Sequence, residues 1–236
     1  MKIITTYFLR KKWYYKLLQV FKKSVKKTMP NIDLEVLKNI PPLNEITDKY
    51  KKRKKDVEFA FTQVADYILK SKSEEVIAVC DVDLMFLKSI EDIENLSFDI
   101  ALTVRESKTK YNTGLWFCRP TKKTKIFIKK WLKNTCYLMK KFEKRLKYIL
   151  AQGGIDQAGL YMTLQKNPNM NIKIIELPCQ EWNATQSEWK FVDENTRMIH
   201  IKSLLRNAIF NKLAVEKIPD YFKPLILKWR NYFDNT

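Results

Sequence analysis

An apolar segment that runs directly into two aspartates constrains the fold of this chain most strongly. Residues 76–80 read Val-Ile-Ala-Val-Cys, Asp81 and Asp83 follow with one residue between them, and residues 84–87 are apolar again. An apolar run of this length, flanked by charge, is typical of a central parallel strand that helices cover on both faces. Two unpaired carboxylates inside such a strand would be costly to bury. We therefore expect them at its carboxyl end, where open α/β sheets bind ligands.

The spacing of the two aspartates indicates a cation site. Residues i and i+2 of an extended backbone point to the same face. The two carboxylates can therefore converge on one divalent cation and on a diphosphate bound to it. The same spacing is also compatible with two solvated acids at a strand end. The apolar run before Asp81 and the pattern after Asp83 favour the cation site.

Strand-like and helix-like segments alternate along the rest of the chain without an internal repeat. Apolar and β-branched patterns predict strands at 2–7, 32–37, 99–104, 112–118, 172–177 and 197–201, and apolar stripes predict helices at 13–27, 48–69 and 121–148, with another from 155. This order predicts an α/β fold with a mostly parallel central sheet flanked by helices. We expect one domain over residues 1–205, followed by a basic, amphipathic helical segment over 206–236.

Length and cysteine usage point to an intracellular globular protein. A chain of 236 residues with 45% hydrophobic residues can bury one large core. The four cysteines lack CxxC spacing, so we expect neither a zinc site nor a disulfide framework. No apolar stretch is as long as a membrane span, and the N-terminus lacks the apolar region of a signal peptide. We expect a cytoplasmic protein, peripheral on the inner face of the membrane if it meets one.

The formal net charge of +19 leaves several classes of partner open. Nucleic acid, an anionic membrane surface, an acidic substrate and a generally lysine-rich composition are all compatible with it. Eight of the 45 basic residues are arginine, the residue that base readout favours, so nucleic acid is the less favoured partner. Residues 220–233 combine aromatic and basic side chains. They predict a helix that either lies in an anionic membrane interface or packs on the core.

The glycines fall in two segments that also carry polar side chains. Both segments can line a ligand pocket, because glycine lets the backbone turn sharply or approach a ligand closely. Ordinary turn and helix-start chemistry is the alternative. The glycines are Gly114, Gly153, Gly154 and Gly159, and their polar neighbours are Asn112, Thr113, Asp156 and Gln157.

His200 is the chain's single histidine and lies in the apolar segment 198–201. A histidine in this setting is either a core residue or a ligand that joins the two carboxylates. Oxygen-rich coordination with one imidazole suits Mn2+ or Mg2+ better than a structural zinc.

Taken in order, these motifs resemble the GT-A nucleotide-diphospho-sugar transferases that carry a DxD motif. The resemblance spans roughly residues 48–203. The residues that carry it are Asp81-Val82-Asp83, Asn112-Thr113-Gly114 leading into Arg119-Pro120-Thr121, Trp131, Asp156-Gln157, Leu177-Pro178 leading to Trp182-Asn183, and His200. The chain departs from the family after His200, where Ile201-Lys202-Ser203 lacks the usual glycine and later lysine, and nothing after residue 205 matches.

The resemblance implies roles for individual residues. Asp81 would approach the ribose and the metal, Asp83 would bind a Mn2+ or Mg2+ ion that bridges the diphosphate, and His200 would be the late metal or diphosphate ligand. A nucleotide-sugar, by default a UDP-sugar, would be the donor. Its base would lie against Thr5, Thr6 and Tyr7, the donor sugar and acceptor against Asn112, Thr113 and Gly114, and the transferred sugar against Asp156 and Gln157.

The implied activity is glycosyl transfer to a glycan, lipid-linked or protein acceptor. Asp156 is the first candidate for the general base if the reaction inverts, whereas the resemblance favours retention. Two other functions stay open. A metal-dependent nucleotidyltransferase usually has a glycine-rich, basic phosphate loop near its N-terminus, and residues 1–12 contain no glycine. A basic protein that binds nucleic acid or membranes would keep its polyanion binding after Asp83→Ala.

Overall fold

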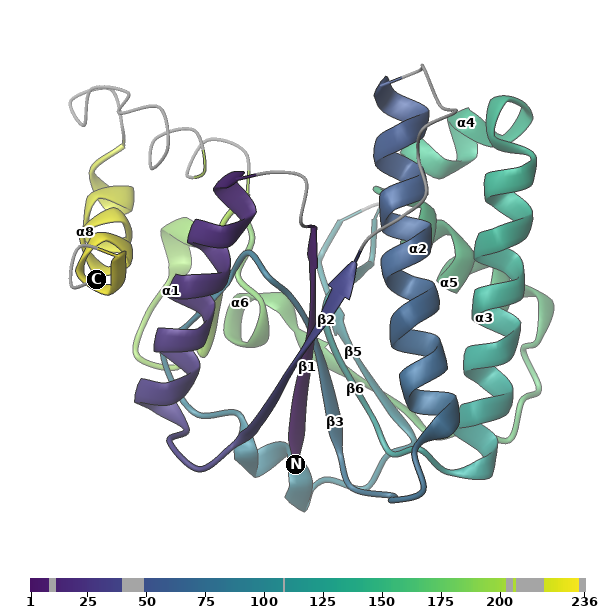
Figure 1. The fold of residues 1–236 in the computed structure, drawn as a ribbon, viewed down its shortest axis with the longest axis horizontal. Coiled ribbons are helices and arrows are strands. Elements are labelled where there is room, and N and C mark those ends of the chain that lie inside the picture. Colours follow the sequence, from purple (N-terminus) through teal and green to yellow (C-terminus); the bar gives the residue numbers. More distant parts are fainter. Residues whose placement is uncertain (9–11, 40–48, 108, 203–205, 207–218, 234–236) are drawn as a thin grey trace.

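A six-stranded sheet forms the centre of the protein (Figure 1). The computed structural model describes residues 1–8, 12–39, 49–107, 109–202, 206 and 219–233. The strand order is β2-β1-β3-β6-β5-β7. Its strands are β1 (Lys2–Phe8), β2 (Asp33–Asn39), β3 (Ile77–Asp81), β5 (Ile100–Val104), β6 (Tyr111–Cys118) and β7 (Ile174–Pro178). β6 runs antiparallel to both neighbours and the remaining pairs are parallel, which confirms the mostly parallel sheet.

Helices cover both faces of this sheet, as the sequence predicts. On one side lie α1 (Lys12–Thr28), the short α6 (Cys179–Trp182) and, outside α1, α8 (Lys223–Phe233) (Figure 1). On the other side lie α2 (Lys49–Lys70), α3 (Lys122–Lys140), α4 (Phe142–Ala151) and α5 (Ile155–Lys166). Short 3-10 turns are η1 (Glu91–Asn95), η2 (Trp189–Phe191) and η4 (Asp220–Phe222). Residue 48, the predicted start of α2, lies outside the described residues.

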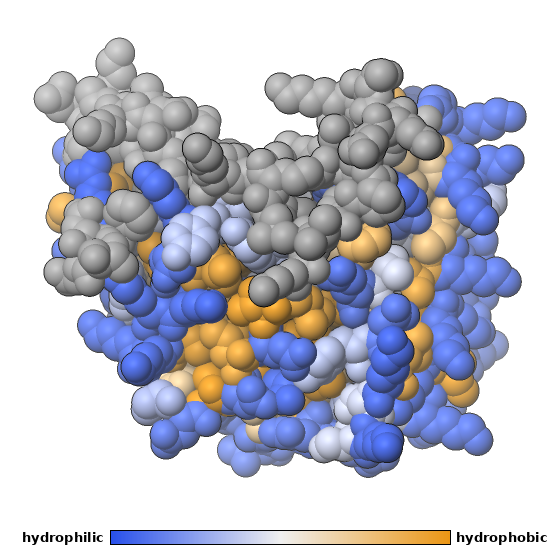
Figure 2. All heavy atoms as spheres, in the orientation of Figure 1, coloured by the Kyte–Doolittle hydropathy of each residue, from blue (hydrophilic) through white to orange (hydrophobic). Residues whose placement is uncertain are grey.

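The central strands are buried on both faces because successive residues feed two separate cores. Ile3 and Ala78 belong to the cluster on the α1 side, whereas Ile4 and Val79 belong to the cluster on the α2 and α3 side. This two-sided burial explains why residues 76–80 read as a continuous apolar run. Figure 2 shows hydrophobic side chains in the middle of one face of the molecule, with hydrophilic side chains beside and below them. All four cysteines are free, as expected.

Two of the sequence-based expectations about helices and strands are wrong. The single helix expected over 121–148 is two helices, because Lys141 leaves helical geometry (φ −108°, ψ 29°) between α3 and α4. The change of direction turns Phe142 and Ile149 into a small core with Ile155. Strands and helices also do not alternate throughout. β3, β4 (Leu84–Phe86), β5 and β6 follow one another with only the 3-10 turn η1 between β4 and β5.

The last predicted strand lies outside the main sheet. β8 (Met198–His200) pairs antiparallel with β4 in a separate two-stranded sheet, where Leu84 is opposite His200. Met85 and Ile199 of this small sheet pack in a third hydrophobic cluster with residues of α1 and α8.

The apolar face of the C-terminal helix packs on the core. Phe222, Leu225, Ile226 and Trp229 are buried in the cluster that α1 and the small sheet also form. This is the second of the two arrangements expected for residues 220–233, and it leaves Leu227 exposed. Within the described residues, no helix combines the length and hydropathy of a membrane span. The predicted segment 206–236 includes 207–218 and 234–236, which lie outside the described residues.

Gly159 lets α5 approach α3 closely, and its replacement by alanine tests that packing. A Cβ at this position would overlap Thr135 Oγ1 of α3 and lie 3.1 Å from Thr135 Cα. In an open helix, Gly→Ala stabilises by about 1 kcal/mol. Here we expect Gly159→Ala to lower the free energy of unfolding by about 1–3 kcal/mol, because overpacking outweighs the helix propensity. Urea denaturation measures the change.

The double variant Gly159→Ala/Thr135→Ala is the matched control for this prediction. Removing Thr135 Oγ1 removes the nearest obstacle, so the double variant should recover part of the lost stability. A single variant as stable as the parent protein would show that α3 and α5 are not packed this tightly.

Candidate metal centre and pocket

The two aspartates lie at the carboxyl end of β3, where the sequence places them. Asp81 is the last residue of β3, but Asp83 lies in the turn before β4 and not on extended backbone. The predicted same-face strand geometry is therefore wrong. The chain turns here because β4 leaves the main sheet to pair with β8. The Ile201 N–H donates to the Asp83 carbonyl at 2.7 Å and fixes this turn.

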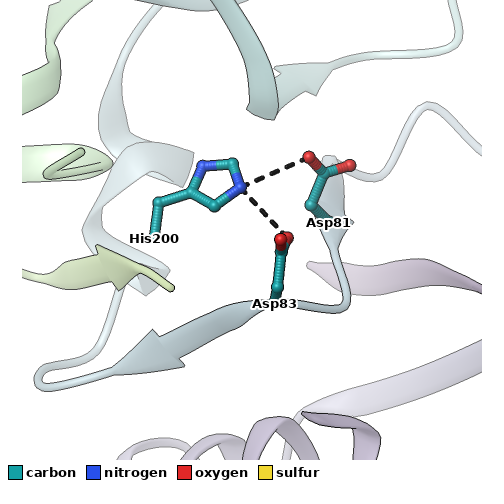
Figure 3. Close-up of side chains that lie close together, drawn as sticks. All are labelled: Asp81, Asp83 and His200. Atoms are coloured by element: carbon teal, nitrogen blue, oxygen red, sulfur yellow. Dashed lines mark hydrogen bonds and ion pairs between the residues drawn. The ribbon is translucent and has the colours of Figure 1, made fainter. Parts of the chain in front are cut away.

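His200 faces both carboxylates from the end of β8 (Figure 3). Its Nε2 atom lies 3.0 Å from Asp83 Oδ1 and 3.5 Å from Asp81 Oδ2. One potential ligand atom from each of the three residues lies within 4.8 Å of the others. The histidine is fully buried, whereas the Asp81 side chain is 48% exposed. The buried His200 therefore forms the inner side of this group, and Asp81 forms the side that is open to a ligand.

Gly114 has a structural task that the sequence did not reveal. A Cβ on Gly114 would collide with His200 Cε1 and lie 2.7 Å from His200 Nδ1. The missing side chain makes room for the imidazole ring. The Gly114 N–H donates to Asn112 Oδ1 at 3.0 Å, so the buried Asn112 side chain braces the same strand.

The electrostatics of the group favour a bound cation. The pocket walls partly desolvate the Asp81 carboxylate, and the negative charge of Asp83 repels its ionised form, so the pKa of Asp81 rises to about 7 although its side chain is 48% exposed. Burial alone would raise the pKa of Asp83, but the facing His200 and the Arg206 guanidinium lower it. Burial and the positive charge of Lys202 lower the pKa of His200, which favours the neutral imidazole that binds metal ions.

Two cations, Lys202 and Arg206, were missed by the sequence analysis. Arg206 forms an ion pair with Asp83 and donates from Nε to the Ile201 carbonyl at 3.2 Å. Both cations line the pocket beside the carboxylates. The one available signal was their position soon after His200, where the chain departs from the family pattern. The predicted domain boundary assigned Arg206 to the C-terminal segment, yet this residue contacts the centre of the site.

The donor set fits a hard divalent cation. Two carboxylates and one neutral imidazole supply oxygen and nitrogen ligands without sulfur, which suits Mn2+ or Mg2+. Asp81 would bind with its solvent-facing carboxylate, and Asp83 would exchange Arg206 for the metal at one oxygen.

A pocket of about 260 Å3 opens above this group. Its walls come from β1, β3, β6, the start of α5 and one face of α2. Predicted site residues that line it are Thr6, Asp81, Asp83, Thr113, Asp156 and Gln157, together with Gly153 and Gly154. Thr5, Tyr7, Asn112, Gly114 and His200 are not in its lining, and Thr5, Asn112 and His200 are buried. Lys54, in the basic stretch at the start of α2, also lines the pocket, next to Asp56.

Asp156 is held at the first turn of α5, opposite the metal ligands. Its side chain accepts a hydrogen bond from the Thr113 hydroxyl, and its carbonyl accepts one from Trp131 Nε1 at 2.8 Å. Gly153, with φ 81°, makes the sharp turn that starts the helix. Gln157 Nε2 donates to the Gln152 carbonyl at 2.7 Å. The structure thus brings Thr113, Asp156 and the aspartate pair to one pocket, while their binding roles stay predictions.

Comparisons by sequence find no matching family model and no significant match among curated proteins. Solved structures do match. A glycosyltransferase involved in the glycosylation of the major capsid of PBCV-1 has 13% identity and a TM-score of 0.58, covering 88% of this chain and 97% of that one. The galactosyltransferase LgtC, in complex with donor and acceptor sugar analogues, has 12% identity and a TM-score of 0.60, covering 100% and 96%.

A third similar structure is the glycosyltransferase GlyE of Streptococcus pneumoniae TIGR4. It has 13% identity and a TM-score of 0.61, and the match covers 98% of this chain and 60% of that one. Identity at this level shows a shared fold. This chain has the GT-A fold.

The space that Gly114 leaves for His200 can be tested by metal binding. Gly114→Ala should displace the imidazole from the carboxylates and weaken Mn2+ binding by roughly tenfold or more, as disturbed ligand orientation does elsewhere. Titration of Mn2+ followed by electron paramagnetic resonance measures the affinity. Gly159→Ala is the matched control, because it places the same methyl group in a tight contact away from the site. Unchanged Mn2+ affinity in Gly114→Ala would contradict the assignment of His200 as a metal ligand.

The raised pKa of Asp81 predicts a pH-dependent metal affinity. Below pH 7 the metal must displace a proton from Asp81, so Mn2+ affinity should fall by up to about tenfold per pH unit and level off above pH 7. Protonation of His200 should weaken Mn2+ binding only near pH 4. Calorimetry between pH 5.5 and 8.5 measures how steeply the Mn2+ affinity changes with pH. Asp81→Asn should remove this pH dependence. A Mn2+ affinity that does not change with pH in the parent protein would contradict a proton on Asp81 below pH 7.

Proposed function

We propose that the protein is a glycosyltransferase that moves a sugar from a nucleotide-diphospho-sugar to a hydroxyl group of an acceptor. The observation that carries this proposal is the meeting of Asp81, Asp83 and His200 at the carboxyl end of β3. They meet beside a pocket, in a fold that solved glycosyltransferases share.

The donor is a nucleotide-sugar, with a UDP-sugar as the default, and the cofactor is Mn2+ or Mg2+. Asp81, Asp83 and His200 would hold the cation. A bound divalent cation would neutralise the charge that develops on the diphosphate leaving group. Thr6, whose strand partner in the sheet is Asp81, is placed to contact the ribose or base.

The cations beside the aspartates support a diphosphate subsite. Lys202 and Arg206 line the same pocket as the two carboxylates. The planar guanidinium of Arg206 suits two phosphate oxygens at once. Arg206 would exchange its contact with Asp83 for the diphosphate when donor and metal bind. The protein would then keep a positive charge next to the leaving group during the reaction.

The transferred sugar would lie between the aspartates and the start of α5. Asp156, Gln157 and Thr113 are the polar groups that face this space, and Asn112 and Gly114 would support it from β6. The bond from the anomeric carbon to the diphosphate breaks, and a bond to the acceptor oxygen forms. Retention, which the resemblance favours, sends the acceptor proton to the leaving phosphate. Inversion would send it to Asp156.

The acceptor is proposed as a glycan, a lipid-linked glycan or a protein, handled in the cytoplasm or at the inner membrane face. Because the apolar face of α8 packs on the core, a peripheral membrane contact is proposed for its solvent-facing side alone. Leu227 is exposed, and Lys228 and Arg230 lie on the same short helix.

Calorimetry of nucleotide binding tests the proposal. UDP, GDP and CDP are titrated with and without Mn2+ into the parent protein and into Asp83→Asn, which removes one charge without changing shape. We expect one nucleotide to bind only with Mn2+, and we expect the variant to lose this binding. Asp220→Asn is the matched control, because the Asp220 side chain is 92% exposed and forms an ion pair with Lys223 of the same C-terminal segment.

The outcomes separate the candidate functions. Metal-dependent binding that Asp83→Asn abolishes would justify a hydrolysis screen of the matching sugar nucleotides. Nucleoside triphosphates that react in place of sugar nucleotides would favour a nucleotidyltransferase. If no nucleotide binds, or if only salt-dependent polyanion binding survives in Asp83→Asn, the proposal fails.

A further inference from the structure

Behind His200, a buried chain of hydrogen bonds runs from the imidazole into the main sheet. His200 Nδ1 lies 3.0 Å from Asn183 Oδ1. Asn183 Nδ2 lies 3.1 Å from Thr103 Oγ1. The Thr103 hydroxyl in turn lies 2.7 Å from the Asn112 carbonyl and 2.9 Å from the Leu115 carbonyl. Thr103, Asn183 and His200 are each fully buried, and the Cys179 thiol also contacts the Thr103 hydroxyl.

The direction of each hydrogen bond in this chain follows from the β6 carbonyls. A carbonyl oxygen can only accept, so the single Thr103 hydroxyl proton is donated to one of the two carbonyls. The Thr103 oxygen is then left to accept from Asn183, which fixes the amide with its NH2 group toward Thr103 and its oxygen toward His200. An amide oxygen also only accepts, so His200 Nδ1 carries the proton. In a neutral imidazole, Nε2 is then left with its lone pair.

We propose that Thr103 and Asn183 are positioning residues that fix the Nδ1–H of His200 toward Asn183, so that Nε2 is the ring nitrogen that faces Asp81 and Asp83 and can bind a cation. The inference rests on the metal site of the proposed function. Nε2 then lies 3.0 Å from Asp83 Oδ1 and 3.5 Å from Asp81 Oδ2, which places one nitrogen ligand next to two carboxylates.

We call the hydrogen bonds from Thr103 through Asn183 to His200 the relay. The backbone around the relay explains why Thr103 and Asn183 can hold the imidazole in place. The pairing of β5 with β6 shifts between Leu102 and Thr103, from Trp116 to Asn112. The resulting bulge brings the Asn112 and Leu115 carbonyls to the Thr103 hydroxyl. Asn183 is fixed by its neighbour, because the Ala184 carbonyl accepts from the His200 N–H at 2.9 Å. The relay therefore joins the bulge of the main sheet to the small β4–β8 sheet.

Nitrogen NMR on the metal-free protein tests the inference directly. The chain has one histidine, so labelling with 15N-histidine reports on His200 alone. Protonated and unprotonated imidazole nitrogens have well-separated 15N shifts. At neutral pH we expect the parent protein to show a protonated Nδ1. An unprotonated Nδ1 would overturn the proposal.

Paired variants separate positioning from mere packing. Thr103→Val keeps the shape but removes the hydroxyl, which frees the Asn183 amide to turn its NH2 toward His200. We expect the proton to move to Nε2 and Mn2+ affinity to fall by about 10–100-fold. Thr103→Ser keeps the hydroxyl and should restore both readouts, whereas Thr135→Val, at another buried threonine, should change neither. Unchanged NMR spectra and affinity in Thr103→Val would contradict the relay.

Asn183→Leu provides a second route to the same answer. It removes the acceptor for Nδ1–H, so the proton should again move to Nε2, where Asp83 accepts it. Neither the 15N NMR spectrum nor the Mn2+ titration needs a nucleotide or a sugar. A protein with the expected proton position that binds no nucleotide would leave the relay intact and refute the proposed function. Mn2+-dependent nucleotide binding together with an unprotonated Nδ1 in the metal-free protein would do the reverse.

Discussion

The antiparallel pairing of β4 with β8 is the constraint on which the site depends. It brings together Asp83 and His200, which are 117 positions apart in the chain. The pairing places Leu84 opposite His200, and the Ile201 N–H closes the turn at the Asp83 carbonyl. β8 is hydrogen-bonded on both edges, to β4 on one side and to Ala184 on the other, and packing adds to this anchoring. The apolar side of the small sheet lies in one cluster with α1 and α8. The C-terminal helix thus supports the metal ligands from behind.

The second organising feature is an acidic group inside a strongly basic protein. The formal net charge is +19, yet the pocket gathers Asp81, Asp83 and Asp156 on facing walls. Lys202 and Arg206 stand next to them, and the ion pair of Arg206 with Asp83 stabilises the ionised carboxylate. Such a pocket can accept a cation at its carboxylates and an anionic ligand at its bases. A metal-bound diphosphate carries both charges, and this match unites the metal centre with the proposed donor.

Much of the architecture was predictable from the sequence, because a strand that is buried on both faces of the sheet has a continuous apolar sequence. The order of the main strands, the covering helices and the place of Asp81 at the end of β3 all follow from such patterns. The contribution of Arg206 and the space that Gly114 leaves for His200 did not follow, because both arise from contacts between distant segments. The break at Lys141 was missed for a related reason, since the residues around it have ordinary helix propensity and the turn is set by packing of Phe142. Asp83 was placed on a strand because spacing alone does not reveal that the chain changes sheets at that point.

The most direct test of the metal centre is pulsed electron paramagnetic resonance of the Mn2+-bound protein, with natural-abundance and with 15N-labelled histidine. Because His200 is the single histidine, any imidazole nitrogen bound to the ion must come from it. The account predicts a coupling to one directly bound nitrogen that changes from the 14N to the 15N pattern when histidine alone is labelled. Mn2+ that binds without a nitrogen coupling, or with a coupling insensitive to the label, would contradict the assignment of Asp81, Asp83 and His200 as one metal site.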